Sequence, residues 1–407
     1  MPNSTPLSPN ASGWTLTLAF CIWGMGLGMP WKVPIGFAGV GVGELLALIA
    51  LALMIIERRY QDLREGYKST RYILATFGIF IALTAVGGLF ATLYFEPSLR
   101  SVFGVLRQAM IMLLIIPLVR SSAAKRPRNK YAEAMVIGAL IAIAVNVAFW
   151  VLRISKTISL PGQNELGIAL VIALPWAMAL SFKAERKATQ LIWTVATAAI
   201  IGATIWTWSK AAWISAAIVV LVIFSVVICT GEQRHRDSMR NALLPLLVIA
   251  LTSGLLARNT ISWIIRTEIT SSSGAGSNKQ RIMASAAGFK VGESYPIGVG
   301  TAHFKEATEE MQVPLLWRIP DPHSSIAQAV TYAGYFGLCA LIIGYLQMAR
   351  QVASGVRREP VRVAAGLAVL VGGFLLMLTS GILLTQPPLW AASALAMANP
   401  LQNDEGD

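Results

Sequence analysis

The residues best suited to chemistry stand at the start of a long apolar run. His323 and Ser324 precede this run, and Gly334 and Gly337 lie one turn apart within it. A polar cluster at the edge of an apolar segment costs free energy unless water, a partner or a substrate meets it. His323 is a candidate general base, because an imidazole with an ordinary pKa of about 6.5 accepts a proton near neutral pH. The glycines lack side-chain bulk, so another helix or an acyl chain can approach the backbone closely.

The remainder of the chain is typical of a polytopic membrane protein. Among its 407 residues 55% are hydrophobic and 13% are charged, which does not describe a soluble globular chain. Apolar runs of about 20 residues, long enough to cross about 30 Å of hydrocarbon as helices, recur along the chain. We expect an all-α fold with a single membrane domain over residues 1–407. The twelve predicted transmembrane helices lie near 13–30, 34–56, 72–94, 100–119, 131–151, 164–182, 189–207, 211–230, 241–257, 323–349, 361–384 and 387–400.

The distribution of Lys and Arg predicts the orientation. These residues concentrate in alternate short loops, around 58–71, 120–130, 183–187, 234–240 and 350–362, and cytoplasmic loops hold such an excess. Both termini are therefore expected in the cytoplasm, with residues 258–322 as one large periplasmic loop between the ninth and tenth spans. The net charge of +13 is explained by this topology, so nucleic acid is not an expected partner.

The periplasmic loop itself is expected to be partly helical and to meet an anion. Ile282, Ala286 and Phe289 fall on one helical face, which predicts a helix at the membrane surface. The loop also keeps several cations, Arg266 and Arg281 among them, on the side where topology does not call for them. Lipid phosphate is the simplest anionic partner. The three cysteines fall inside predicted spans, so neither a disulfide framework nor a metal cluster is expected.

Charged residues inside or beside the predicted spans are further candidates, since such residues are expensive in a bilayer. Arg107 either lines an aqueous, diphosphate-binding cavity or forms a structural ion pair with Glu44. Glu165 lies beside Asn164 at the outer entry of a span and is a candidate for lining a polar site. Lys210, at the start of a span, either binds substrate or extends its ammonium group to the interface.

The motif at 323 resembles a known family. The pattern His-Ser, nine residues, Gly, two residues, Gly is similar to the signature of bacterial O-antigen ligases, within the O-antigen ligase and polymerase superfamily. Arg281 and the segment YPIGVGTAHF (295–304) resemble the Arg-containing helix and glycine segment of that family's periplasmic loop. TWSKAAWIS (207–215) and LPGQNELGIALVIALP (160–175) resemble two further family segments. One position departs from the pattern, because Lys210 stands where the family most often has Arg and lacks the bidentate guanidinium.

The resemblance implies a glycosyltransferase at the periplasmic side of the bacterial inner membrane. It would move an O-antigen glycan from undecaprenyl diphosphate to a sugar hydroxyl of lipid A-core, completing lipopolysaccharide. No metal or other cofactor is implied. His323 would be the base, and Arg281 would stabilise the diphosphate. The further substrate-binding candidates are Lys210, Arg107, Glu165, Arg266 and Ser324.

Three alternatives stay open at this level. An O-antigen or exopolysaccharide polymerase uses the same kind of donor with a growing glycan as acceptor. A lipid-linked glycan transporter also suits twelve spans, although we find no paired halves with broken helices. A noncatalytic partner in envelope assembly predicts that replacement of His323 leaves activity intact.

Overall fold

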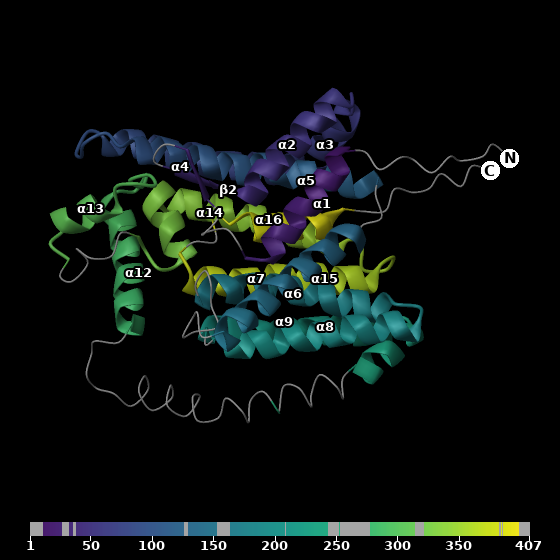
Figure 1. Cartoon of the computed structure of the whole chain (residues 1–407). Coiled ribbons are helices and arrows are strands. Elements are labelled where there is room, and N and C mark those ends of the chain that lie inside the picture. The colour runs from purple at the N-terminus through teal and green to yellow at the C-terminus, as the bar shows by residue number, and fades with distance from the viewer. Residues whose placement is uncertain are drawn as a thin grey trace.

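The computed structural model describes residues 11–26, 32–35, 38–125, 129–152, 163–207, 209–242, 252, 277–313, 321–381, 384 and 386–398. Helices dominate the described part, and most of them lie alongside one another in a bundle (Figure 1). The helices are α1 (Ala11–Gly24), α2 (Val42–Ile56), α3 (Tyr60–Ala91), α4 (Leu99–Ala109), the π-helix η1 (Met110–Ile115), α5 (Ile116–Lys125), α6 (Asn129–Val151), α7 (Gln163–Lys183), α8 (Lys187–Trp206), α9 (Lys210–Thr230), α12 (Ser277–Ser294), α13 (Phe304–Glu310), α14 (Ser325–Ala353), α15 (Pro360–Thr379) and α16 (Pro387–Met397).

Eight helices among the described residues are long and apolar enough to cross a membrane. They are Tyr60–Ala91, Leu99–Ala123, Asn129–Val151, Asn164–Lys183, Lys187–Trp206, Lys210–Thr230, Ser325–Ala353 and Pro360–Thr379. The chain is therefore a helical membrane protein, and eight of the predicted spans coincide with these helices. The helices at the first, second and twelfth predicted spans have only 14, 15 and 11 residues. The ninth predicted span lies almost wholly outside the described residues, so a total of twelve stays a prediction.

The second predicted span starts later than the hydropathy indicated. Strands β1 (Lys32–Ile35) and β2 (Ala38–Gly41) pair as an antiparallel hairpin, in which Lys32 lies opposite Gly41. A helix from residue 34 was wrong here, because proline and glycine disfavour a helix interior and this stretch contains Pro34, Gly39 and Gly41. Helix α2 begins only at Val42.

Helix α7 forms the centre of the bundle. Nearly all of its span is buried, and it contacts α6, α8, α9 and α15. The outer helices instead expose apolar side chains such as Leu191, Ile192 and Leu221. Such exposure is expected where a helix face meets lipid tails, because the hydrocarbon solvates these side chains. The sequence pattern alone does not separate the two cases, since α7 and its neighbours are similarly apolar.

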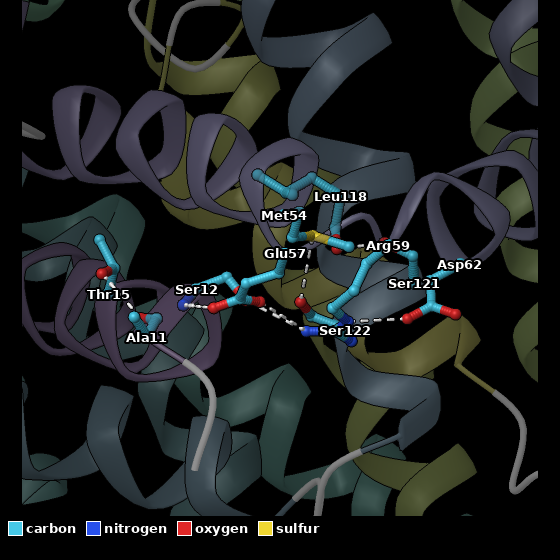
Figure 2. A network of polar contacts seen from close by, with 10 residues as sticks. All are labelled: Ala11, Ser12, Thr15, Met54, Glu57, Arg59, Asp62, Leu118, Ser121 and Ser122. Atoms are coloured by element: carbon cyan, nitrogen blue, oxygen red, sulfur yellow. Dashed lines mark hydrogen bonds and ion pairs between the residues drawn. The ribbon is translucent and has the colours of Figure 1, made fainter. Parts of the chain in front are cut away.

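Basic residues assigned to the cytoplasm by sequence make ordered contacts between helix ends. Arg59, after α2, donates through Nε to Asp62 at 2.8 Å and through Nη1 to the hydroxyl of Ser12 at 3.1 Å (Figure 2). Ser12 also donates through Oγ to Glu57 at 2.6 Å, which ties the start of α1 to the turn between α2 and α3. Arg120 donates to the carbonyl oxygen of Met397 at 3.0 Å. These contacts join helix ends at the face predicted to be cytoplasmic, and the assignment of that face stays a prediction.

Candidate active site

A break in α14 organises the opposite end of the bundle. Gly334 has φ 65° and ψ −173°, so the helix is interrupted there. The N–H groups of Val299 and Gly300 donate to the carbonyl oxygens of Thr331 at 2.8 Å and Tyr332 at 3.1 Å. In a continuous helix these carbonyls would accept from amides four residues later. The loop before α13 thus replaces helical hydrogen bonds and is inserted at the break.

Five glycines allow this insertion, and we name them the glycine junction: Gly87, Gly88, Gly298, Gly300 and Gly334. A Cβ atom on Gly334 would lie 1.8 Å from the carbonyl oxygen of Pro296, and one on Gly300 would lie 2.5 Å from Cα of Gly88. Gly298 and Gly300 also have positive φ angles of 83° and 70°, which side chains rarely tolerate. Backbones from α3, the loop and α14 therefore meet directly. The sequence predicted close approach at Gly334, and the approaching element is the loop.

The second glycine of the motif, Gly337, follows the break in α14. A Cβ atom on Gly337 would lie 3.4 Å from the ring of Phe80 on α3 and 2.2 Å from Cβ of Ala333 within α14. The contact with Phe80 is an ordinary van der Waals distance, so the approach of α3 does not require glycine here, and the lack of a side chain at Gly337 instead avoids a clash with Ala333 at the break in α14.

Ser324 begins α14 and is largely buried, with 5% of its surface exposed. Its Oγ accepts from the amide of Ala327 at 3.5 Å as an N-cap and donates to the carbonyl oxygen of Met377 at 3.3 Å. Ser325 donates through its hydroxyl to the carbonyl oxygen of Ser380 at 2.5 Å. These contacts fasten the start of α14 to the end of α15. The geometry gives the Ser324 hydroxyl a capping role, and its role in substrate binding stays a prediction.

The structure brings Arg281 close enough to His323 to affect its protonation. Helix α12 crosses the start of α14, where a Cβ on Gly288 would lie 3.0 Å from Oγ1 of Thr331 and 3.1 Å from Cβ of Ala327. Partial burial lowers the pKa of His323 below its ordinary value, and the positive charge of Arg281 lowers that pKa further. A lowered pKa favours the neutral imidazole, which is the form able to accept a proton. The structure thus relates Arg281 and His323, which the sequence singled out in separate segments, and their joint role in catalysis stays a prediction.

Asp321, two residues before His323, contacts a side chain that the sequence did not indicate. The buried hydroxyl of Tyr332 donates to Oδ1 of Asp321 at 3.3 Å. Burial raises the pKa of Asp321 to about 6, while the hydrogen bond from Tyr332 acts in the opposite direction. In the part of the chain that the structure describes, Asp321 makes no hydrogen bond to His323. The eleven-residue spacing between Asp321 and Tyr332 spans the helix start, so no local pattern indicated the pair.

Lys210 and Asn164 lie at the same end of the bundle as His323. Ser209 caps α9 and donates through its hydroxyl to Oδ1 of Asn164 at 3.0 Å, which joins the starts of α7 and α9. Gly372 of α15 packs between Val171 of α7 and Val219 of α9, and Lys183 at the end of α7 lies 3.5 Å from Glu359 at the start of α15, so α15 runs antiparallel to α7. The outer end of α15 therefore lies level with these two helix starts.

Glu165 is the neighbour of Asn164 in the first turn of α7 and is partly buried. This position agrees with its prediction as a residue at the entry of a span. The predicted candidate Arg266 lies outside the described residues.

Arg107 forms the structural ion pair that the sequence left as one of two alternatives. Its Nη2 lies 2.9 Å from Oε1 of Glu44, whose side chain is only 2% exposed. The other carboxylate oxygen of Glu44 accepts from the amide of Gly41 at 2.8 Å, just after the hairpin. Both charges are therefore compensated inside the apolar bundle, and this geometry does not require a ligand diphosphate.

His303 has a packing role that the sequence did not indicate. Its ring stacks on Phe95 with the centroids 5.8 Å apart, and the side chain is 2% exposed. Burial lowers the pKa of His303, with an opposing effect from Glu306. A neutral stacked imidazole fastens the loop to the end of α3.

The described residues do not indicate a metal site. Among the described residues, no group of three or more His, Cys, Asp and Glu side chains gathers in a way that could hold a metal ion. Independence from metal stays a prediction. In comparisons with known proteins, no protein-family model matches the chain and no curated protein matches its sequence.

Proposed function

We propose that this protein is an O-antigen ligase of the bacterial inner membrane. It transfers a glycan from undecaprenyl diphosphate to a sugar hydroxyl of lipid A-core on the periplasmic side. The observation that carries this proposal is the proximity of His323 and Arg281, a neutral base and a cation, at one end of a helical membrane bundle. Both substrates, the undecaprenyl-linked glycan and lipid A-core, are anchored in the membrane at that surface.

The chemistry follows from these two groups. The acceptor hydroxyl oxygen attacks the anomeric carbon of the donor glycan, and its proton passes to the imidazole of His323. The bond between the anomeric carbon and the diphosphate oxygen breaks, and its electron pair leaves with the diphosphate. Arg281 stabilises the negative charge that builds on this leaving group. The lowered pKa of His323 keeps the imidazole unprotonated before the reaction.

Lys210 is the second cation of the proposed site. It begins α9 at the end of the bundle where α7 starts and α15 ends. An ammonium group there complements a diphosphate as a point charge, without the two parallel hydrogen bonds of a guanidinium. We assign it to donor binding rather than to the reacting bond.

The direct test uses the full chain in nanodiscs with an undecaprenyl-diphosphate-linked O-glycan, with and without lipid A-core. Product size is read on a gel for wild type, His323→Ala and the matched control His235→Ala. His235 follows the end of α9 opposite to Lys210 and lies near Lys183 at the end of α7. A chelator in parallel reactions tests independence from metal.

Glycan on lipid A-core from wild type and His235→Ala, but not from His323→Ala, supports the ligase. Longer undecaprenyl-linked chains in the absence of lipid A-core would identify a polymerase instead. A donor that stays intact with wild-type protein would rule out both transferases and favour transport or assembly. Transfer by His323→Ala at the wild-type rate would remove the imidazole from the mechanism.

A further inference from the structure

A separate apolar cavity lies between α6, α7 and α8, with a volume of about 320 Å³. This volume is near the lower end of the range for small-molecule sites, about 300 to 1,000 Å³. No residue assigned to the transfer reaction lines it. The lining residues used below are Val147, Trp150, Leu166, Gly202, Ala203 and Trp206.

The cavity has a closed floor and a mouth on the outer surface of the bundle. Leu166 of the central helix α7 is 1% exposed and closes the inner side. Val147 and Trp150 of α6 are 42% and 47% exposed and stand at the mouth. Gly202 and Ala203 leave one wall without long side chains, so a branched chain can lie against the backbone of α8.

The cavity lies beside the last two turns of α6 and α8. On α6 the cavity extends from Ile143 to Trp150, which corresponds to about 10 Å of helix. It ends at Trp150 and Trp206, whose rings lie 6.3 Å apart at an interplanar angle of 62°. Tryptophan pairs of this kind are typical of the boundary between lipid headgroups and hydrocarbon. The cavity thus leads from that boundary into the hydrocarbon region.

This boundary is also the level of the proposed donor site. Trp206 ends α8 three residues before Ser209, and Leu166 follows Asn164 by two residues on α7. Ser209 and Asn164 are joined by a hydrogen bond of 3.0 Å, and Lys210 follows directly. An anionic headgroup above the cavity would therefore meet a cation.

We propose that the cavity binds the part of a polyprenyl phosphate chain nearest to its headgroup. The inference rests on the proposed function, which supplies such a lipid as donor. A mouth that faces lipid tails excludes a soluble peptide as occupant. A single cavity suits a lipid with one chain better than a phospholipid with two, and the small residues of α8 leave room for the methyl branches of an isoprenoid.

The test measures lipid binding to the full chain by native mass spectrometry, with undecaprenyl monophosphate as the probe and phosphatidylglycerol as the two-chain anionic competitor. Ala203→Phe fills the cavity. Val195→Phe is the matched control, because Val195 lies on the same helix, is 58% exposed and does not line the cavity. Trp206→Ala removes a wall without overpacking, which keeps the test informative if Ala203→Phe folds poorly.

We expect Ala203→Phe to raise the dissociation constant of undecaprenyl monophosphate at least tenfold and Trp206→Ala to raise it several-fold. Val195→Phe should bind like wild type. Equal binding by all variants would overturn the assignment of the cavity. Phosphatidylglycerol that binds as tightly and displaces the probe would overturn the polyprenyl occupant.

The two proposals fail in different ways. If the chain is not a glycosyltransferase, wild type transfers no glycan but still binds the probe in a manner sensitive to Ala203→Phe. If the cavity does not hold the donor chain, wild type and Ala203→Phe transfer glycan equally well.

Discussion

Substitution of Gly334 by alanine should undock the inserted loop while leaving the helical bundle folded. The new Cβ atom would lie 1.8 Å from the carbonyl oxygen of Pro296, a backbone atom that cannot rotate away. The backbone angles of φ 65° and ψ −173° are also nearly exclusive to glycine. The variant must therefore expel the loop or straighten α14.

The size of the effect can be worked from the strain in the docked state. Strained backbone at a residue other than glycine costs about 1 to 3 kcal/mol, and only the docked loop imposes it. The hydrogen bonds from Val299 and Gly300 are lost on undocking in wild type and variant alike, so they do not change the difference between the two proteins. About 3 kcal/mol, the upper end of the strain, corresponds to about a hundredfold shift toward the undocked loop.

Hydrogen exchange in nanodiscs measures this shift without any assumption about activity. We expect the amides of Val299 and Gly300 to exchange about a hundredfold faster in Gly334→Ala than in wild type. Gly78→Ala is the matched control, because a Cβ atom at Gly78 in α3 meets nothing within 4 Å. Unchanged protection of the two amides in Gly334→Ala would refute the insertion of the loop at the helix break.

Three further predictions concern charged groups. Arg107→Ala leaves the carboxylate of Glu44 buried without its cation and should destabilise the protein by about 3 to 5 kcal/mol. The double variant with Glu44→Gln should recover part of this stability. Equal thermal unfolding of the single and double variants would contradict this. The acidic limb of the pH–rate profile for glycan transfer should lie below pH 6.5. It should move to higher pH in Arg281→Gln, because the positive charge of Arg281 lowers the pKa of His323. A profile that does not move would show that Arg281 does not affect the protonation of His323. Asp321→Asn should stabilise the protein at pH 8 but not at pH 4. The raised pKa of about 6 means that the folded state favours the neutral acid, and the stability that this acid contributes is lost as pH rises through 6. A difference in thermal stability that does not depend on pH would exclude this account.

The sequence by itself determined the class of the protein and the place of its chemical groups along the chain. Apolar runs of spanning length identified eight helices that the structure contains, because the bilayer imposes a length and hydropathy on each segment separately. The motif around His323 also marked the start of α14 and the two glycines within it. These are local properties, and each can be read without knowledge of a neighbouring helix.

Only the tertiary structure decided what those groups contact. It placed Arg281 near His323, paired Arg107 with Glu44 across 63 residues, and inserted the loop at Gly334. It also began α2 after a hairpin that hydropathy had assigned to a helix. In a membrane protein both buried and lipid-facing helix surfaces are apolar, so hydrophobic pattern carries little information about which faces meet. Partner choice comes instead from the fit of small residues and the pairing of rare charges, which exist only once the helices are assembled.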